Sequence, residues 1–330
     1  MFKIEYDLRF RTSVYQACEA YGNLYVAGSL WDRRKVLYTK EIAKKTRGIL
    51  HIVERGGRFR TKEEIIFPHM AYTVTDMLDG RLFVGCKHKR AALSLIDSSG
   101  NILQQNDDEN GRGSYGVVFD EIFGELLLAT RTGKLEILDS FDLSLKTTIQ
   151  LASSRTRLWA LALDFETGII FASDYDGGLY FLHLAAIGGH EIFSVEELYF
   201  DDIRLGQGFK PAVWGLEIVG FNEILIGTRW GDIFLLEAET RQDISFERLN
   251  SCSVGEDVSC IRKFRDGLFL VGTRYGKVYV FDIERFKLTE LVIEIKPAFQ
   301  KENAVWTMTR IKDGILACFA DGHVCKIVED

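Results

Sequence analysis

The sequence predicts an all-β fold, a β-propeller of seven four-stranded antiparallel blades that the N-terminal strand closes into a ring. Three observations support this prediction. A short strand that begins beside an aromatic residue recurs along the chain, and in the clearest copies it is followed by a hairpin with glycine in its turn. Only 3 of the 330 residues are proline, which would remove a hydrogen-bond donor from a sheet. A repeat of about 40 to 45 residues with four strands is typical of a propeller blade.

The first strand of each repeat is marked by an aromatic residue at a matched position. A seventh copy, Val258-Ser259-Cys260-Ile261, has serine in its place. Consecutive copies start 43 to 57 residues apart, and the two longest intervals indicate insertions in the first and fourth repeats. The matched aromatic residues are Tyr15, Tyr72, Tyr115, Trp159, Trp214 and Trp306.

The rest of each repeat is predicted to form three further strands. The clearest second and third strands, with the turn between them, lie at 225–235 and 270–280. A glycine just before the third strand supplies the positive φ that a hairpin turn needs. A more polar fourth strand follows, for example at 145–151 or 288–295.

The number of strands matches a closed ring. The last repeat, at 305–328, has room for only three strands, and residues 2–10 form a strand that precedes the first repeat. We expect this strand to complete the seventh blade, which removes an exposed sheet edge that would favour aggregation. Residues 1–330 are therefore expected to form a single domain.

The third strands end in an apolar–acidic pair, as in Ile96-Asp97, Leu138-Asp139, Leu236-Glu237 and Phe281-Asp282. With its repeat period, this makes the chain resemble the WD-repeat propellers, in which a Trp-Asp pair ends the third strand. The Gly-His pair of that family is not recognisable here, and another seven-bladed family would match the same period. The resemblance implies a seven-bladed scaffold that binds proteins.

The net charge of −7 conceals a basic segment. Residues 31–62 hold eleven Lys/Arg and three Asp/Glu. They include an expected insertion in blade 1, at about 31–47, and an acidic extension is expected after blade 4, at about 185–210. A basic segment on an acidic body indicates an acidic partner, either a phosphate backbone or an acidic protein surface. A solvated charged loop is the alternative. The basic residues that we assign to partner binding are Arg33, Arg34, Lys44 and Lys45.

In a blade of this kind, the turn between strands two and three emerges on the same face as the connection from strand four to the next strand one. We therefore expect the matched aromatics near the channel mouth, beside basic residues of the turns. Trp, Tyr and Arg are enriched in binding hot spots and also stack on RNA bases. This composition predicts a protein or ribonucleoprotein partner, although the aromatics could instead only pack between blades. The basic residues of these turns are Lys87, Arg90, Arg131, Arg229 and Arg274.

Several other functions lack a signal in the sequence. No Cys/His set has zinc-ligand spacing and no catalytic motif is recognisable, so we expect no metal or cofactor and assign no catalytic residue. No apolar run of about 18 residues and no signal peptide is present, which predicts a cytoplasmic or nuclear protein without a membrane span. Cys318 and Cys325 flank an expected turn at Asp321-Gly322 and should lie directly opposite each other, either as a redox pair or as two buried thiols.

A second resemblance is confined to the first blade. The segments Ala27-Gly28-Ser29-Leu30-Trp31, Arg33-Arg34 and Gly48-Ile49-Leu50 are similar to the first blade of the WD-repeat diphthine methyl ester hydrolases. That family acts on elongation factor 2 in the diphthamide pathway. This resemblance implies a methyl ester hydrolase as the alternative to a non-enzymatic scaffold.

Overall fold

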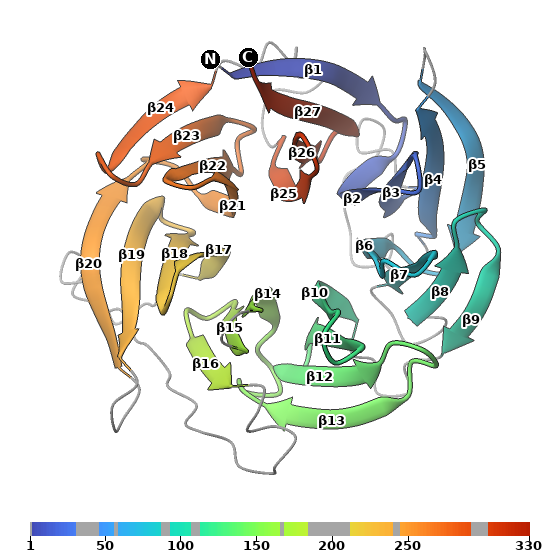
Figure 1. Cartoon of the computed structure of the whole chain (residues 1–330), viewed down its shortest axis with the longest axis horizontal. Helices are drawn as coiled ribbons and strands as arrows, with labels where there is room; N and C mark the ends of the chain where they lie inside the picture. The colour runs from blue at the N-terminus through green and yellow to red at the C-terminus, as the bar shows by residue number, and fades with distance from the viewer. Residues whose placement is uncertain are drawn as a thin grey trace.

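The computed structural model describes residues 2–30, 46–55, 59–86, 93–106, 113–165, 168–183, 212–239, 245–291 and 303–330. Their strands form seven antiparallel sheets arranged around a central axis (Figure 1). Six sheets have four strands, and the described part of blade 4 has three. The predicted seven-bladed, all-β propeller is thereby confirmed. The described residues contain no helix that is long and apolar enough to cross a membrane.

The blades follow one another along the chain, and each begins with its innermost strand. Blade 1 has β2 (Ser13–Ala20), β3 (Asn23–Ser29), β4 (Gly48–Arg55) and β5 (Phe59–Phe67). Blade 2 has β6 (Ala71–Asp76), β7 (Arg81–Cys86), β8 (Leu93–Asp97) and β9 (Ile102–Asn106). Blade 3 has β10 (Ser114–Asp120), β11 (Glu125–Thr130), β12 (Lys134–Asp139) and β13 (Leu145–Gln150). Blade 4 has β14 (Leu158–Asp164), β15 (Ile169–Asp174) and β16 (Leu179–His183).

The remaining three blades complete the circle. Blade 5 has β17 (Val213–Gly220), β18 (Glu223–Thr228), β19 (Asp232–Glu239) and β20 (Ser245–Ser253). Blade 6 has β21 (Val258–Arg265), β22 (Leu268–Thr273), β23 (Val278–Asp282) and β24 (Lys287–Leu291). Blade 7 has β25 (Val305–Ile311), β26 (Gly314–Phe319), β27 (His323–Glu329) and, as its outer strand, β1 (Phe2–Arg9).

The N-terminal strand closes the ring, as predicted. It pairs antiparallel with β27, from Phe2 opposite Glu329 to Arg9 opposite His323 (Figure 1). Lys326 is 0% exposed, and its Nζ lies 2.6 Å from Glu5 Oε2 and 2.7 Å from Asp313 Oδ2. A buried ammonium needs such partners, so the contact with Glu5 ties the closing strand to β27.

Every first strand contains a β-bulge at the matched aromatic position. In β2, Val14 pairs with Gly28 and Gln16 pairs with Ala27, which leaves Tyr15 as the extra residue. A bulge frees one residue from the ladder and changes the direction of its side chain. The register skips one residue in the same way in all seven blades, at Tyr15, Tyr72, Tyr115, Trp159, Trp214, Ser259 and Trp306.

Blades 5 and 6 pack closely on the next blade through glycine near the end of the second strand. Gly227 of β18 is an example, because a Cβ there would overlap Val258 Cγ1 of blade 6 and lie 3.0 Å from Val258 Cβ. Gly272 of β22 faces Val305 of blade 7 in the same way, with 2.8 Å between a Cβ and Val305 Cγ1. The interfaces between blades are therefore filled at these positions.

The acidic residues at the ends of the third strands have a local role. Asp97 Oδ1 accepts hydrogen bonds from the backbone N–H groups of Ser99, at 2.9 Å, and Asn101, at 2.8 Å. Asp139 Oδ1 accepts one from Phe141 N at 2.8 Å. These carboxylates therefore satisfy the backbone of the turn that leads to the fourth strand.

The prediction for the two C-terminal cysteines is wrong by one register position. Cys318 lies opposite Val324, and Cys325 lies opposite Ala317. The turn between β26 and β27 holds one residue fewer than direct pairing of the two cysteines needs, and a one-residue change in register reverses the face of a side chain. Both cysteines are free and buried in separate clusters, and burial raises the pKa of each thiol.

We expect the substitution Gly227→Ala to destabilise the fold by about 1–3 kcal/mol, because the added methyl group overpacks the interface with blade 6. Gly220→Ala is the matched control in the same blade, since a Cβ there would meet only Glu223 Oε2 at an ordinary 3.7 Å. Urea unfolding of the three proteins measures the difference. Equal stability of both variants would show that blade 6 rearranges around the added methyl group without a cost in stability.

The contact of Asp7 with blade 7 predicts a dependence of stability on pH. Burial raises the pKa of Asp7, but hydrogen bonds from His323 and Cys325 and the charge of His323 outweigh it and hold the pKa below its usual value. Asp7 therefore stabilises the fold above its unfolded pKa of about 3.9, and this contribution is lost as the pH falls through the folded pKa. The stability difference between wild type and Asp7→Asn should shrink on acidification in urea titrations. A difference that is constant between neutral and acidic pH would contradict this assignment.

Candidate functional site

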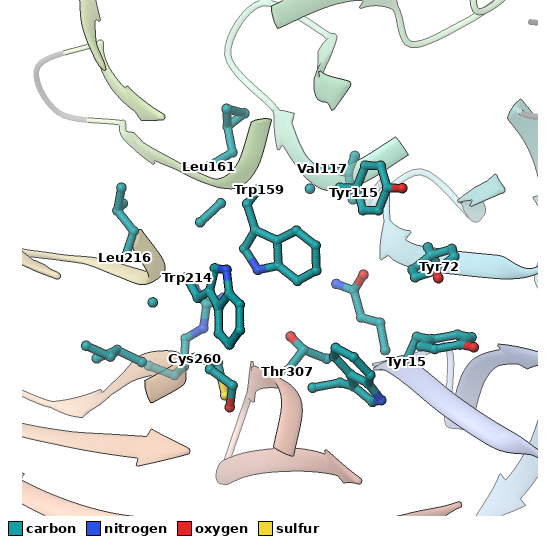
Figure 2. Close-up of a pocket in the computed structure, with 18 residues that line it drawn as sticks. Tyr15, Tyr72, Tyr115, Val117, Trp159, Leu161, Trp214, Leu216, Cys260 and Thr307 are labelled. Carbon is teal, nitrogen blue, oxygen red and sulfur yellow. The ribbon is translucent and has the colours of Figure 1, made fainter. Parts of the chain in front are cut away.

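The matched aromatic residues meet around the central axis, as predicted (Figure 2). Tyr15 stacks on Tyr72 with 4.4 Å between ring centroids, and Tyr115 stacks on Trp159 at 5.6 Å. Three further pairs complete the arc, namely Tyr72–Tyr115 at 5.5 Å, Trp159–Trp214 at 6.0 Å and Tyr15–Trp306 at 6.1 Å. Aromatic contacts at these separations stabilise one another, so the six side chains form one ordered arc.

The arc is open at blade 6, where the matched residue is Ser259. Its hydroxyl lies 3.0 Å from the carbonyl oxygen of Gly272 and 2.6 Å from that of Val305 in blade 7. Blade 6 is therefore joined to its neighbour by a hydrogen bond at the position where the other blades use ring stacking. The serine that interrupts the sequence pattern also leaves a gap between Trp214 and Trp306.

The aromatic arc lines a cavity of about 130 Å³ in the central channel. Deeper walls come from Gln16, Leu161, Leu216 and Arg262. Pockets for metabolite-sized ligands are usually about 300 Å³ or more, so this volume holds a single side chain or a comparably small group. The channel mouth is thus better suited to part of a larger partner than to an enclosed small molecule.

Two of the predicted arginines converge on Trp214. The guanidinium carbons of Arg229 and Arg274 lie 5.7 Å and 5.9 Å from the ring centroids of this tryptophan. Both also approach the same carboxylate oxygen, Asp257 Oδ2, at 4.0 Å and 3.5 Å respectively. Both guanidinium groups therefore gather with Asp257 on the surface beside Trp214.

Blade 4 adds two residues that the sequence analysis did not assign, Arg157 and Tyr175. The ring of Tyr175 lies 5.9 Å from both Trp159 and Trp214. The guanidinium of Arg157 lies 5.8 Å from the ring centroid of Tyr115 and 5.9 Å from that of Tyr175. Tyr175 occupies the turn position that Arg229 and Arg274 hold in their blades, so alignment of the turns could have found it; Arg157 has no such signal.

A recurring backbone hydrogen bond places these side chains together. Tyr175 N–H donates to Arg157 O, Arg229 N–H to Ala212 O and Arg274 N–H to Asp257 O, each at 2.9 Å. In every case the donor is in the turn between the second and third strands, and the acceptor directly precedes the first strand. The two kinds of connection therefore share one face, as predicted.

Trp214 is 9% exposed, and its Nε1 has no hydrogen-bond acceptor within the described residues. Figure 2 shows this indole beside that of Trp159 in the wall of the cavity. A buried N–H without an acceptor is costly and uncommon in a native protein. This donor is therefore the clearest indication that the surface is completed by a group from outside the chain.

Of the other predicted binding residues, the structure describes only Arg131. Arg131 is exposed in the turn between β11 and β12, away from any described ring contact or ion pair. Leu30 N–H bonds to Arg47 O at 3.0 Å and closes the hairpin at the base of the basic insertion, between β3 and β4. The remaining assignments lie outside the described residues, namely Arg33, Arg34, Lys44, Lys45, Lys87, Arg90 and the acidic extension at 185–210.

We define the aromatic–arginine face as the six matched aromatics together with Tyr175, Arg157, Arg229 and Arg274. Two acidic residues flank Tyr175 in the chain. Asp174 accepts hydrogen bonds from Asp176 N, Gly178 N and Tyr180 OH, and Asp176 Oδ2 accepts one from Thr156 Oγ1 at 2.5 Å. Across the described residues, no group of three or more His, Cys, Asp or Glu side chains is placed to hold a metal ion. Comparison with known proteins finds no matching family model and no curated protein of similar sequence.

Substitution of Ser259 tests whether its hydroxyl stabilises the interface of blades 6 and 7, where the aromatic arc is open. We expect Ser259→Ala to cost about 0.5–1.5 kcal/mol, because one buried hydroxyl bond across the interface of blades 6 and 7 is lost. Ser251→Ala, at an exposed position on β20, should leave stability unchanged. Thermal and urea unfolding measure both variants, and an effect of equal size in the two would refute the role assigned to Ser259.

Proposed function

We propose that this chain is a non-enzymatic recognition scaffold that binds a protein or ribonucleoprotein partner through its aromatic–arginine face. The observation that carries the proposal is the environment of Trp214. This residue has an unpartnered buried donor, and two guanidinium groups share one carboxylate beside it. The seven-bladed frame supports such a role because a rigid ring presents the side chains in fixed positions.

The chemistry of this face indicates what the partner presents. Rings with nearby guanidinium groups favour planar or apolar groups, and guanidinium groups also bind carboxylates or phosphates. The indole N–H of Trp214 offers a donor to such an acceptor. We therefore expect the partner to insert a small apolar or planar group into the channel mouth, with an acidic group beside Arg229 and Arg274.

The ester-hydrolase alternative rests only on the sequence resemblance in blade 1. Ser29, within the similar segment, is buried, and its hydroxyl lies 3.3 Å from Tyr15 OH. No feature of the described residues specifically favours ester hydrolysis, so the scaffold is the function that we propose. A cytoplasmic or nuclear location is part of the same proposal.

The proposal is tested by affinity purification from the native cell with wild-type and variant bait. The double variant Arg229→Ala/Arg274→Ala should lose the specific partner, because it removes both guanidinium groups beside Trp214. Trp214→Phe keeps a ring and removes the indole donor, and it should weaken partner binding by about tenfold or less. Arg285→Ala, which removes an arginine with an 80% exposed side chain from the turn between β23 and β24, is the matched control.

The result is decided by quantitative mass spectrometry of the captured proteins and RNA, with unfolding curves for every bait. Retention of all partners by the double variant would overturn the assignment of this face. If the partner holds RNA through phosphate contacts, its binding should weaken steeply with salt. A flat response to salt would instead identify an apolar protein interface.

A further inference from the structure

The face opposite the aromatic–arginine face is formed by turns between first and second strands and between third and fourth strands. In blades 1 to 3, these turns present large apolar side chains to solvent. We define the apolar strip as five residues with these exposed fractions: Tyr21 at 41%, Leu78 at 62%, Ile122 at 63%, Phe123 at 60% and Phe141 at 77%. Single exposed apolar residues are ordinary, whereas a group on neighbouring turns indicates an interaction surface.

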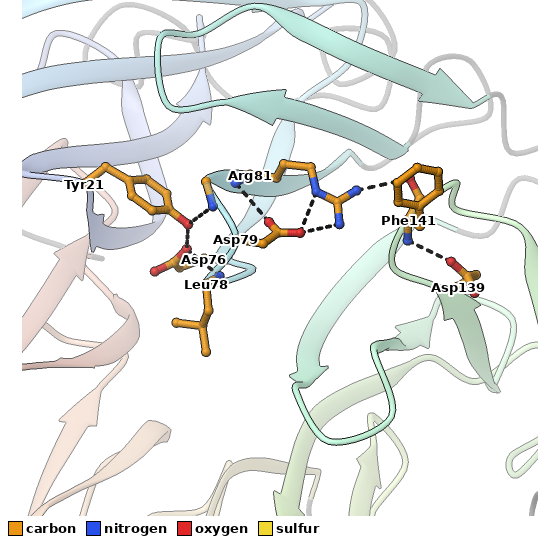
Figure 3. Close-up of polar contacts among 8 residues, drawn as sticks. Tyr21, Asp76, Leu78, Asp79, Arg81, Asp139 and Phe141 are labelled. Atoms are coloured by element: carbon orange, nitrogen blue, oxygen red, sulfur yellow. Dashed lines mark hydrogen bonds and ion pairs between the residues drawn. The ribbon is translucent and has the colours of Figure 1, made fainter.

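The turns that carry the strip are connected across the blades (Figure 3). Tyr21 OH donates to Asp76 Oδ1 at 2.6 Å and accepts from Gly80 N at 2.8 Å, which joins blade 1 to the turn of Leu78. Arg81 donates through Nη1 to Phe141 O at 3.1 Å, and its guanidinium lies 5.5 Å from the Phe141 ring centroid. Within blade 3, Ser140 N donates to Gly124 O at 3.1 Å, beside Phe123. The turns that carry the strip are therefore linked to one another across blades 1 to 3.

Folding alone does not explain Leu78. Leu78 has a φ of +62° and Tyr21 has a φ of +50°, in the left-handed region that disfavours bulky side chains. In blade 5, the turn between the first and second strands places an asparagine in this region instead, since Asn222 has a φ of +57°. A leucine that is both strained and exposed gives no evident gain in stability, and residues of this kind are concentrated at functional sites.

The surroundings of the strip in blades 2 and 3 are acidic. Residues 76–81, 120–125 and 139–146 contain seven Asp/Glu and two Lys/Arg. Both cations are already neutralised, because Arg81 pairs with Asp79, and Lys146 lies 3.2 Å from a carboxylate oxygen of Glu125 and of Asp139. Side-chain and backbone hydrogen bonds from Ser144 hold the pKa of Asp142 below its usual value, so this carboxylate stays charged. Such a surface repels nucleic acid and anionic lipid.

We infer that the apolar strip docks a cationic amphipathic segment of a partner protein. Apolar side chains of that segment would cover Leu78, Phe123 and Phe141, while its Lys or Arg residues would meet the surrounding carboxylates. Opposite charges favour the encounter, and apolar burial supplies most of the affinity. The inference is independent of the aromatic–arginine face, and the two surfaces allow one ring to hold two different partners.

The test uses a library of random peptides displayed on phage and selected on the immobilised full chain. We expect enriched peptides that combine Lys or Arg with large apolar residues. Leu78→Asn/Phe123→Asn/Phe141→Asn should weaken the best peptide by about tenfold or more, since apolar anchors dominate such interfaces. Asparagine tolerates positive φ, so the change at position 78 preserves the turn. Glu121→Lys should also weaken binding, and added salt should do the same.

Phe221→Asn is the matched control, because Phe221 is 75% exposed on the equivalent turn of blade 5 but lies outside the strip. It should bind the selected peptide like the wild type. The inference is overturned if selected peptides lack basic residues or bind the triple variant as tightly as the wild type. It is also overturned if the triple variant loses only binding to anionic vesicles or only self-association, measured by flotation and sedimentation. Unfolding curves show whether the triple variant keeps its fold.

Discussion

The β-bulge at the start of each first strand is the constraint on which the rest of the structure depends. It removes one residue per blade from the ladder and turns that side chain toward the axis, where it meets the equivalent residue of the next blade. The paired second strands bring small residues such as Gly227 and Gly272 against the neighbouring blade. A single irregularity, repeated seven times, thereby sets both the spacing of the blades and the composition of the channel mouth.

Much of the fold could be predicted from the sequence, because a propeller repeats its local signals. The aromatic starts, the glycine turns and the surplus strand at residues 2–10 gave the blade number and the closure correctly. The position of the six aromatics followed from the same regularity. The pairing register of the strands could not be predicted in this way. Cys318 and Cys325 differ from the expected pairing by one residue, because apolar periodicity does not show the length of a turn.

Features that break the repeat were harder to predict. Tyr175 and Arg157 join the aromatic–arginine face from blade 4 alone, and Arg157 occupies a position where the other blades have unrelated residues. The apolar strip was missed for a different reason. Its residues lie in turns, where sequence patterns indicate conformation, and only the exposed fractions show that Leu78 and Phe141 are not covered by the rest of the chain.

Closure of the ring also orders the folding of the chain in time. Asp7 and His323 are in contact although they are separated by 316 positions in the sequence. Contacts between such distant residues carry a high entropic cost before they form, whereas the first six blades are built from neighbouring hairpins. During synthesis, β1 is made before the other strands of the ring but cannot pair until β27 is made. The blade that contains both strands is therefore the last to assemble.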